Sequence, residues 1–470
     1  MSKDLLLEIG TEEIPAHYMP SILSQIKDLA HKKLDEANIS YESIRSLGTP
    51  RRVALLVAGV AEKQSDVSAK NKGPSVKIAY DSEGKPTKAA MGFARGQKIA
   101  VEDLVVEDGY VYANVTTIGK DTASLLPDIL KDIILSLSFP KSMIWGDQTV
   151  HFVRPLRWFV ALFGTDVVPF EIAKVKSGRI SRGHRFLGTG DFEIPSMKDY
   201  EAVTREHFLI VDPEERKQMI LQGMQKLADE KGGTIIMDED LLEEVVFLVE
   251  YPTALCGEFD TEFLQLPEAA IITPMKDHQR YFPMRDKDGK LMNLFLTVRN
   301  GDDYHLETVQ HGNERVLRAR LDDAKFFFEE DKKKKLIDRV DDLQRIVFQD
   351  GLGTLKDKAQ RLEQITTFLN HKLDLGLDDG DLTRLSDLAK TDLLTQMVAE
   401  FTELQGVMGR EYAMIDGEKQ EIADAINEQY LPRFAGDELP QTTMGKVLGI
   451  ADKFDTITGS FSLGLIPTGS

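Results

Sequence analysis

The spacing of the apolar residues changes near residue 305, and this change is the strongest constraint on the fold. Before it, short apolar runs at residues 5–9, 53–57 and 159–163 are typical of strands, with helical spacing between them. After it, the segment 313–336 contains no Gly or Pro and begins a long stretch of helical spacing. The pattern predicts a multidomain α+β protein, in which an N-terminal mixed α/β body precedes an all-helical region.

This change of pattern predicts three consecutive parts of the chain. They are an α/β body of one or two lobes over residues 1–310, a helical connector over 311–345 and a helical domain over 346–470. Inside the body, further strands are predicted at 110–115, 245–249 and 294–298, and a helix at 123–137.

Two local predictions concern polar residues. The polar segment 61–75 contains Gly73-Pro74 near its end and is predicted to be a loop. In the long helix, opposite charges at i,i+4 spacing are predicted to pair along the helix surface. These pairs are Glu314 with Arg318, Arg318 with Asp322, and Lys325 with Glu329.

A dense group of charged residues lies between Pro274 and Pro283, before a run at 291–298 that alternates like a half-buried strand. The two prolines exclude a long helix through this group. Polar side chains in such a place need partners or a ligand. Two interpretations therefore stay open, an internal ion network and a ligand site. The residues concerned are Lys276, Asp277, His278 and Arg280.

The composition is typical of a globular protein, with 42% hydrophobic and 29% charged residues in a chain of 470. No apolar run is long enough to span a membrane, and the first residues lack the pattern of a secretory signal. We therefore expect a cytoplasmic protein. The single cysteine, Cys256, excludes an internal disulfide framework and a cysteine-rich zinc site.

The net charge of −20 argues against nucleic-acid binding, because the field of the protein would repel phosphates, but this charge is unevenly distributed. Residues 371–440 contain 16 Asp or Glu and 6 Lys or Arg, which accounts for half of the net charge. By contrast, residues 172–190 contain no carboxylate. Within them, residues 174–185 form what we name the basic strip. Its cations are Lys174, Lys176, Arg179, Arg182 and Arg185.

The basic strip is a candidate for contacts with phosphates, which position a nucleic acid without reading its sequence. The alternative is a solvated hairpin that carries basic side chains. Arg154 and Arg157 are a second choice for phosphate contacts, although both could instead pair with carboxylates beside a buried Trp158. His184 is expected to have a structural role.

Motifs for nucleotide binding and for catalysis are absent from the sequence. The chain has no Walker loop, no dinucleotide-binding glycine motif, no zinc-protease helix motif and no nucleophile elbow. The glycines near residue 352 are explained by a turn before a helix, with Thr354 as its N-cap. We therefore expect neither a catalytic residue nor a cofactor in this chain.

The helical domain contains a degenerate version of an HD-type phosphohydrolase site. Such a site uses imidazoles and carboxylates to hold a divalent ion that activates water. Asp392 and Asp452 stand at two ligand positions and His371 is a candidate for a first ligand, but Thr391 replaces the central imidazole. Loss of that nitrogen should weaken metal binding. We expect an HD-like scaffold without a metal, and the alternative is an active metal-dependent phosphohydrolase.

Several unusual strings, in one order over the whole chain, resemble those of the bacterial glycyl-tRNA synthetase β subunit. They include LLLEIGTEEIP at 5–15, TPRR at 49–52, FPKSMIWG at 139–146, VRPLRW at 153–158, the segment 272–301, GNERVLRARLDDAKFF at 312–327 and FTELQGVMG at 401–409. Such a series is more specific than a single motif.

The resemblance implies a non-catalytic β subunit of an α2β2 glycine–tRNA ligase that binds tRNA(Gly) and the α subunit. The α subunit would carry the catalytic core and bind ATP and magnesium. Chains of this family continue into an anticodon-binding domain, so the resemblance also implies that this chain is truncated within its helical domain. A structural adaptor without RNA contact is the remaining alternative.

Overall fold

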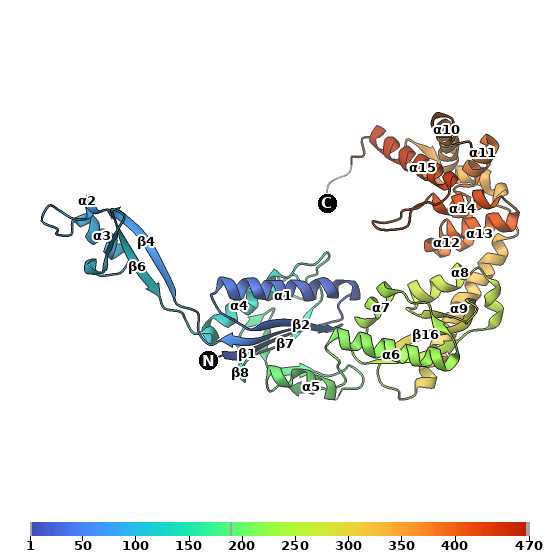
Figure 1. The fold of residues 1–470 in the computed structure, drawn as a ribbon. Helices are drawn as coiled ribbons and strands as arrows, with labels where there is room; N and C mark the ends of the chain where they lie inside the picture. Colours follow the sequence, from blue (N-terminus) through green and yellow to red (C-terminus); the bar gives the residue numbers. More distant parts are fainter. Residues whose placement is uncertain (1, 189, 467–470) are drawn as a thin grey trace. The chain divides into compact units, whose positions relative to one another are not determined.

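The computed structural model describes residues 2–188 and 190–466, and it confirms a mixed α/β protein with several sheets (Figure 1). The chain divides into two compact units, which we describe separately. The first unit comprises Met1–Gly223, Glu239–Thr253 and Val298–Asp303, and the second comprises Met224–Asp238, Ala254–Thr297 and Tyr304–Ser470. The domain boundaries expected from the sequence, at residues 310 and 345, stay predictions.

A seven-stranded sheet forms the centre of the first unit, in the order β2-β3-β1-β7-β10-β9, with β8 paired to β7. Strand β10 runs parallel to β7, and the other pairs are antiparallel. The predictions at 5–9, 53–57 and 159–163 are therefore confirmed. The strands are β1 (Ser2–Thr11), β2 (Ser43–Thr49), β3 (Arg52–Ala61), β7 (Leu156–Phe163), β8 (Asp166–Val167), β9 (Glu171–Ile172) and β10 (Val175–Gly178).

Helices cover both faces of this sheet. Helices α1 (Met19–Glu36) and α4 (Thr122–Ser136) lie on one side, and α5 (Tyr200–Glu206) lies on the other (Figure 1). On the α5 side, alternate strand residues such as Leu6 and Val160 pack against Tyr200 and its neighbours. Because both faces are covered, neighbouring residues of β1, Leu5, Leu6 and Leu7, are all apolar and buried rather than alternating with polar ones.

The segment predicted as a strand at 245–249 is instead the end of a helix, α7 (Glu239–Val246), so that prediction was wrong. Its buried residues are Leu241, Leu242, Val245 and Val246, which lie at helical spacing. A short apolar run has the same appearance in a buried helix and in a buried strand, and periodicity alone does not separate them. Helix α6 (Pro213–Lys231) precedes it.

A small module with its own sheet, of order β4-β6-β5, lies between β3 and α4 in the sequence. The strand predicted at 110–115 is confirmed as β6, whereas the loop predicted at 61–75 was wrong because most of it is β4. Residues 67–70 and Lys72 of β4 are exposed, and the core of the module is built from other elements, which include α3 and β6, so β4 has the polar composition of a loop. The module contains β4 (Val67–Ser75), α2 (Val76–Ala79), α3 (Lys88–Gly96), β5 (Val105–Glu107) and β6 (Tyr110–Thr117).

The second unit contains a four-stranded sheet in the order β13-β15-β16-β14. Strand β16 confirms the prediction at 294–298. Before it, α8 (Glu268–Thr273) passes into one π-helical turn at Pro274–His278, so the charged group between the two prolines lies in no long helix, as predicted. The strands are β13 (Thr234–Ile235), β14 (Pro252–Glu258), β15 (Phe282–Arg285) and β16 (Leu291–Asn300).

The long helix is α9 (Leu306–Asp331), but its predicted surface pairs are wrong. Arg318 pairs with Asp260 at 2.8 Å, Lys325 pairs with Glu262 at 2.7 Å, and Glu314 accepts a hydrogen bond from the backbone of Glu258 at 3.0 Å. The helix packs against residues 258–262. The carboxylates of that segment pair with Arg318 and Lys325 of the helix in place of the carboxylates on the helix itself.

The rest of the second unit is helical apart from a short hairpin of β17 (Val347–Gln349) and β18 (Gly353–Thr354). Thr354 caps α10 through a capping box with Asp357, which confirms the predicted N-cap. The helices are α10 (Leu355–Leu373), α11 (Asp379–Leu388), α12 (Gln396–Glu400), α13 (Val407–Asp416), α14 (Gln420–Glu428) and α15 (Thr443–Ser462). Among the described residues, no helix has the length and apolar character needed to cross a membrane.

Candidate nucleic-acid interface

The basic strip lies at the edge of the main sheet of the first unit. Its first half is β10, which pairs with β9 and with β7, and its second half includes β11 (Ile180–Arg182), which pairs with β12 (Asp191–Glu193). The strip is therefore built into the fold rather than being a free hairpin. Lys174 and Lys176 are exposed on it, and Arg179 and Arg182 are half-buried.

A buried ion network lies behind the strip. Arg52 has no exposed surface, and its guanidinium lies 3.6 Å from Oε2 of Glu8 and 3.3 Å from Oε1 of Glu250. The guanidinium of Arg51 donates to Oε2 of the same Glu250 at 2.6 Å. The hydroxyl of Thr49 also donates a hydrogen bond of 2.7 Å to Oε1 of Glu250. Every charge in this group thus has a close partner, as buried charges require.

This network holds the backbone of the strip. Arg52 donates to the carbonyl oxygen of Arg182 at 2.9 Å, and Arg51 donates to that of Gly183 at 2.8 Å. The hydroxyl of Ser181 donates to Oε1 of Glu8 at 2.5 Å. Three successive residues of the strip are therefore attached to buried charges. Their neighbouring cations are held at a defined place on the surface.

The charges of the network stabilise one another. Burial opposes the charge on Arg52, but the carboxylates of Glu250 and Glu8 outweigh this effect and raise the pKa of the guanidinium. Burial also opposes the charge on Glu250, yet Arg52 and Arg51 keep the pKa of its carboxyl below the usual value. The pair is therefore ionised at neutral pH.

Two aromatic side chains donate hydrogen bonds to Glu8, the second carboxylate of the network. The indole of Trp158 and the hydroxyl of Tyr200 each donate to its carboxylate at 2.5 Å. Burial raises the pKa of Tyr200 well above its usual value, so this hydroxyl stays a donor. Gly10 gives the indole its room, because a Cβ at that position would lie 1.9 Å from Trp158 Cδ2.

The cations of the strip have several kinds of partner. Lys174 pairs with Asp147, and Arg182 lies 3.6 Å from Asp191. Arg185 pairs with Glu12 at 3.0 Å and with Glu13 at 3.3 Å. Arg179 donates to the carbonyl oxygen of Thr165 at 2.8 Å. Lys176 is exposed and has no hydrogen-bond or ionic partner among the described residues.

The second-choice residues lie beside the strip. Arg157 pairs at 3.2 Å with Glu12, the same carboxylate that pairs with Arg185. Arg154 donates to the carbonyl oxygens of Glu13 and Val153 at 3.0 and 2.9 Å. The pairing with carboxylates that the sequence left open is thus found for Arg157 and not for Arg154. These ion pairs are largely exposed and are individually weak.

His184 has a structural role in this arrangement. Its Nδ1 accepts hydrogen bonds from the backbone N–H groups of Phe186 and Leu187, at 3.3 and 3.2 Å. Its Nε2 therefore carries the proton and donates to Oδ1 of Asn300 at 3.0 Å. The same oxygen accepts from the backbone of Glu250. This chain of contacts connects the strip to the segment that carries the network carboxylate.

Sequence reasoning missed the ion network, although its members stand in strings noted above. Glu8 interrupts the apolar run at 5–9, and Arg51 and Arg52 directly precede a buried strand. A charge in a strand that is covered on both faces must be paired, and this was the available signal. Glu250 carries no such signal, because it stands near a loop and far from the other members in sequence.

The residues compared above with an HD-type site lie in the second unit, and two lysines are the partners of Asp452. Asp452 lies 2.9 Å from the ammonium group of Lys358 and 3.0 Å from that of Lys390. Asp392 is buried, accepts a hydrogen bond from the backbone of Gly406 at 2.6 Å, and has its pKa raised by burial to about 6.

The same positions lack the grouping that a metal centre requires. Thr391 donates from its buried hydroxyl to the carbonyl oxygen of Leu388 at 2.8 Å. His371, the candidate first ligand, pairs instead with Asp379 at 2.8 Å. In the part of the chain that the structure describes, no three His, Cys, Asp or Glu side chains are grouped as metal ligands. The geometry therefore gives no support to the phosphohydrolase alternative.

The charged group between Pro274 and Pro283 takes part in internal contacts. Lys276 pairs with Asp238, and the guanidinium of Arg280 donates to the carbonyl oxygen of Asp277. The ring of His278 stacks on that of Phe401 at a centroid distance of 5.7 Å. Burial raises the pKa of Asp277. These contacts favour the internal-network interpretation over a ligand site.

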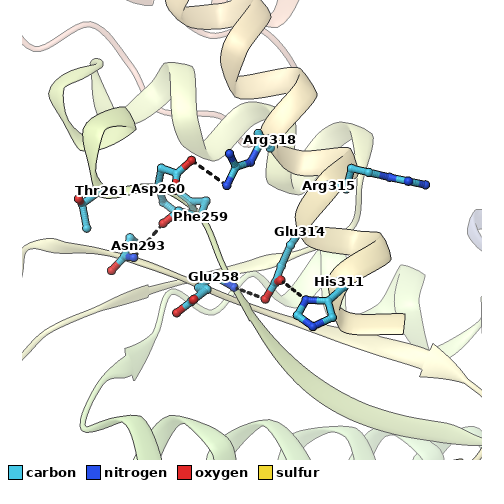
Figure 2. A pocket seen from close by; sticks show the side chains of 9 residues that line it. All are labelled: Glu258, Phe259, Asp260, Thr261, Asn293, His311, Glu314, Arg315 and Arg318. Carbon is cyan, nitrogen blue, oxygen red and sulfur yellow. Dashed lines mark hydrogen bonds and ion pairs between the residues drawn. The ribbon is translucent and has the colours of Figure 1, made fainter. Parts of the chain in front are cut away.

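A polar cavity of about 410 Å³ also lies in the second unit, beside α9 (Figure 2). Arg318 and Asp260 pair across part of it, and Glu314 accepts from His311 at 3.0 Å. Arg315 points away from the other lining residues (Figure 2). The polar groups of this cavity mostly bind one another, and we assign it no ligand.

Comparison with known proteins identifies the family. A family model described as the glycyl-tRNA synthetase beta subunit matches residues 5–470. The chain belongs to this family. The glycine–tRNA ligase beta subunit of Desulfitobacterium hafniense (strain DSM 10664 / DCB-2) is 49% identical over 475 residues, which cover 100% of this chain and 69% of the relative. That of Bacillus subtilis (strain 168) is 48% identical and is covered over 70% of its length.

Glycyl-tRNA synthetase β subunits are parts of an aminoacyl-tRNA synthetase, a ligase of protein biosynthesis. A third relative, the glycine–tRNA ligase beta subunit of Moorella thermoacetica, is 46% identical over 475 residues and is covered over 68% of its length. The resemblance read from the separate strings is therefore confirmed as family membership. Two of those strings, at 5–15 and 49–52, supply Glu8, Thr49, Arg51 and Arg52 of the network behind the basic strip.

Proposed function

We propose that this chain binds tRNA(Gly) as the non-catalytic β subunit of a glycine–tRNA ligase, and that the basic strip contacts the phosphates. The observation that carries this proposal is the attachment of residues 181–183 to the buried ion network, with cations exposed on either side. Such contacts position an RNA and carry no sequence information. The names of the relatives, glycine–tRNA ligase beta subunits, supply the kind of RNA.

The chemistry of the reaction belongs to another subunit in this proposal. Activation of glycine requires a site for ATP and magnesium, and the sequence contains no motif for either. We assign both to a catalytic α subunit, in an α2β2 assembly in the cytoplasm. The HD-like helical domain then serves as a scaffold, with ammonium groups beside Asp452.

Salt-dependent tRNA binding tests the strip directly. The triple variant Arg179→Ala, Arg182→Ala, Arg185→Ala should bind tRNA(Gly) more weakly than the parent chain. The slope of log affinity against log salt concentration should become shallower by about 2 to 3, because each lost phosphate contact removes about 0.7 to 0.9. The matched control replaces Lys332, Lys333 and Lys335, near the end of α9, by Ala and removes the same charge.

Three results would contradict this proposal. An unchanged salt slope in the strip variant, or an equal loss in the control variant, would show that the strip is not a specific contact. Failure of the parent chain to bind tRNA at low ionic strength would exclude RNA binding altogether. Mixing with a glycyl α subunit, followed by separate measurements of complex formation and of charging, tests the division of labour.

A further inference from the structure

A second surface with the chemistry of an RNA contact lies on the small module, away from the basic strip in the sequence. In its sheet, Lys72 of β4 stands opposite Tyr112 of β6, and Ser75 stands opposite Tyr110. Side chains two residues apart share a face of a strand. Lys70, Lys72, Tyr110 and Tyr112 therefore share one face, which we name the tyrosine face.

The tyrosine face is open, whereas on the opposite face β6 packs against α3. Val111 and Ala113, which alternate with the tyrosines, are buried against Ala90 and Ala94 of α3. On the tyrosine face, both lysines are exposed and Tyr110 keeps 37% of its surface accessible. Two aromatic rings and two ammonium groups are thus displayed where no core requires them.

Each ammonium group of the face lies over a ring. Nζ of Lys72 is 3.5 Å from the ring centroid of Tyr110, and Nζ of Lys70 is 4.7 Å from that of Tyr112. Lys70 also pairs with Glu107 of β5. An exposed cation–π contact is weaker than the stacking of a base on an aromatic ring. An arriving base can therefore replace the ammonium group on the ring, and the ammonium group can turn to a phosphate.

The charge around the face suits a polyanion. Residues 67–98 contain seven Lys or Arg and two Asp or Glu, in a chain whose net charge is −20. Residues 99–117 add four acidic residues and no Lys or Arg. One of them, Glu107, stands opposite Tyr110 and pairs with Lys70 on the tyrosine face, so this carboxylate must be displaced from Lys70 by an arriving phosphate. Lysine supplies point charges for phosphates, and tyrosine supplies flat surfaces for bases of any identity. A protein partner with acidic side chains would use the lysines but would not explain the two exposed tyrosine rings.

We propose that the tyrosine face binds unpaired nucleotides of an RNA strand, with bases stacked on Tyr110 and Tyr112 and phosphates beside Lys70 and Lys72. The rings come from positions two residues apart in one strand, about 7 Å from each other along it, so they receive neighbouring bases only when these are unstacked. Bases inside a duplex are not accessible in this way. This inference rests on the proposed function for the class of ligand, but it uses different residues.

Binding of two RNA probes by the full chain tests the inference. The probes are a fluorescein-labelled single strand of eight nucleotides and the duplex that it forms with its complement, both at low ionic strength. Tyr110→Ala with Tyr112→Ala should weaken binding of the single strand roughly tenfold or more. The pair Tyr110→Phe with Tyr112→Phe should stay within about twofold of the parent, because phenylalanine also stacks. Tyr304→Ala, which removes another exposed ring, is the matched control.

Specific results would overturn the inference. Equal binding by the parent and the alanine pair would exclude stacking on these rings. Equal loss for the alanine and phenylalanine pairs would attribute the effect to folding or to the hydroxyl groups. Equal loss for single strand and duplex would show that the rings do not contact unpaired bases. If the strip variant loses tRNA binding while the alanine pair matches the parent with both probes, this inference fails and the proposed function stands. Absence of tRNA binding by the parent chain identifies failure of the proposed function.

Discussion

The guanidinium of Arg52 lies 3.3 Å from Oε1 of Glu250, and the two residues are separated by 198 positions in the sequence. Both side chains are almost completely buried. A buried ion pair adds little net stability compared with apolar side chains of the same volume, but removal of one partner leaves an uncompensated charge. This pair therefore makes folding of the first unit depend on two distant segments at once.

Glu250→Gln should lower the free energy of unfolding by about 3 to 5 kcal/mol, because Arg51 and Arg52 would lose their shared counter-charge. Urea denaturation measures this loss. The control is Asp191→Asn, which removes the exposed partner of Arg182 and should cost less than about 1 kcal/mol. A loss of similar size in both variants would contradict the assigned role of Glu250.

Stability should also depend on pH through Glu250. The pKa of its carboxyl is below the usual 4.5 in the folded chain, because Arg52 and Arg51 outweigh the effect of burial. The contribution of the ionised group is therefore complete above pH 4.5 and is lost as the pH falls through the folded pKa. Urea titrations of the parent and Glu250→Gln from acid to neutral pH should show the stability difference shrinking toward acid. A difference that stays constant would contradict this linkage.

Gly10→Ala should disturb the indole of Trp158, since a Cβ at residue 10 would lie 1.9 Å from its Cδ2. The ring must shift from its present position, and overpacking of this kind costs about 1 to 3 kcal/mol. Fluorescence of Trp158 in a Trp145→Phe background reports the movement, and urea denaturation reports the cost. Gly92→Ala in α3 is the control, because no atom lies within 4 Å of the added Cβ there. Equal fluorescence of the parent and Gly10→Ala would show that the indole had not moved.

Asp392→Asn should stabilise the chain near neutral pH. Burial raises the pKa of this carboxyl to about 6 from a usual 3.8, so its stabilising protonated form is lost as the pH rises through the folded pKa. The amide avoids this cost, which is on the order of 1 to 3 kcal/mol at neutral pH. It also keeps an oxygen for the N–H of Gly406. Melting temperatures between pH 4 and 7.5 should decline less steeply for the variant, and parallel curves would contradict the assignment.

The sequence predicted the elements that have a clear period or a clear terminus. The helix at 123–137, the strand at 5–9 and the N-cap at Thr354 were all correct. The segments at 61–75 and 245–249 were wrong for a common reason. A strand with one solvated polar face resembles a loop, and a short buried helix resembles a strand, until the packing partner is known.

The candidate site was predicted less completely than the fold. Sequence inspection found no carboxylate between residues 172 and 190, yet Asp147, Glu12 and Glu13 reach the strip from other segments. The i,i+4 pairs on α9 failed in the same way, because Asp260 and Glu262 came from outside the helix. The spacing of residues within a segment predicts the secondary structure of that segment. The partners of its charged side chains depend on which other segments pack against it.

The carboxylate of Glu12 pairs with both Arg157 and Arg185, and this shared pairing affects which anions can bind to the two arginines. A single phosphate must displace the Glu12 carboxylate from the two arginines, and this carboxylate is always present because it belongs to the same chain. A strand of linked phosphates engages several cations in one event, so each further contact is gained at a high effective concentration. The strip should therefore discriminate by valency, and free phosphate or a mononucleotide should compete poorly with an intact RNA.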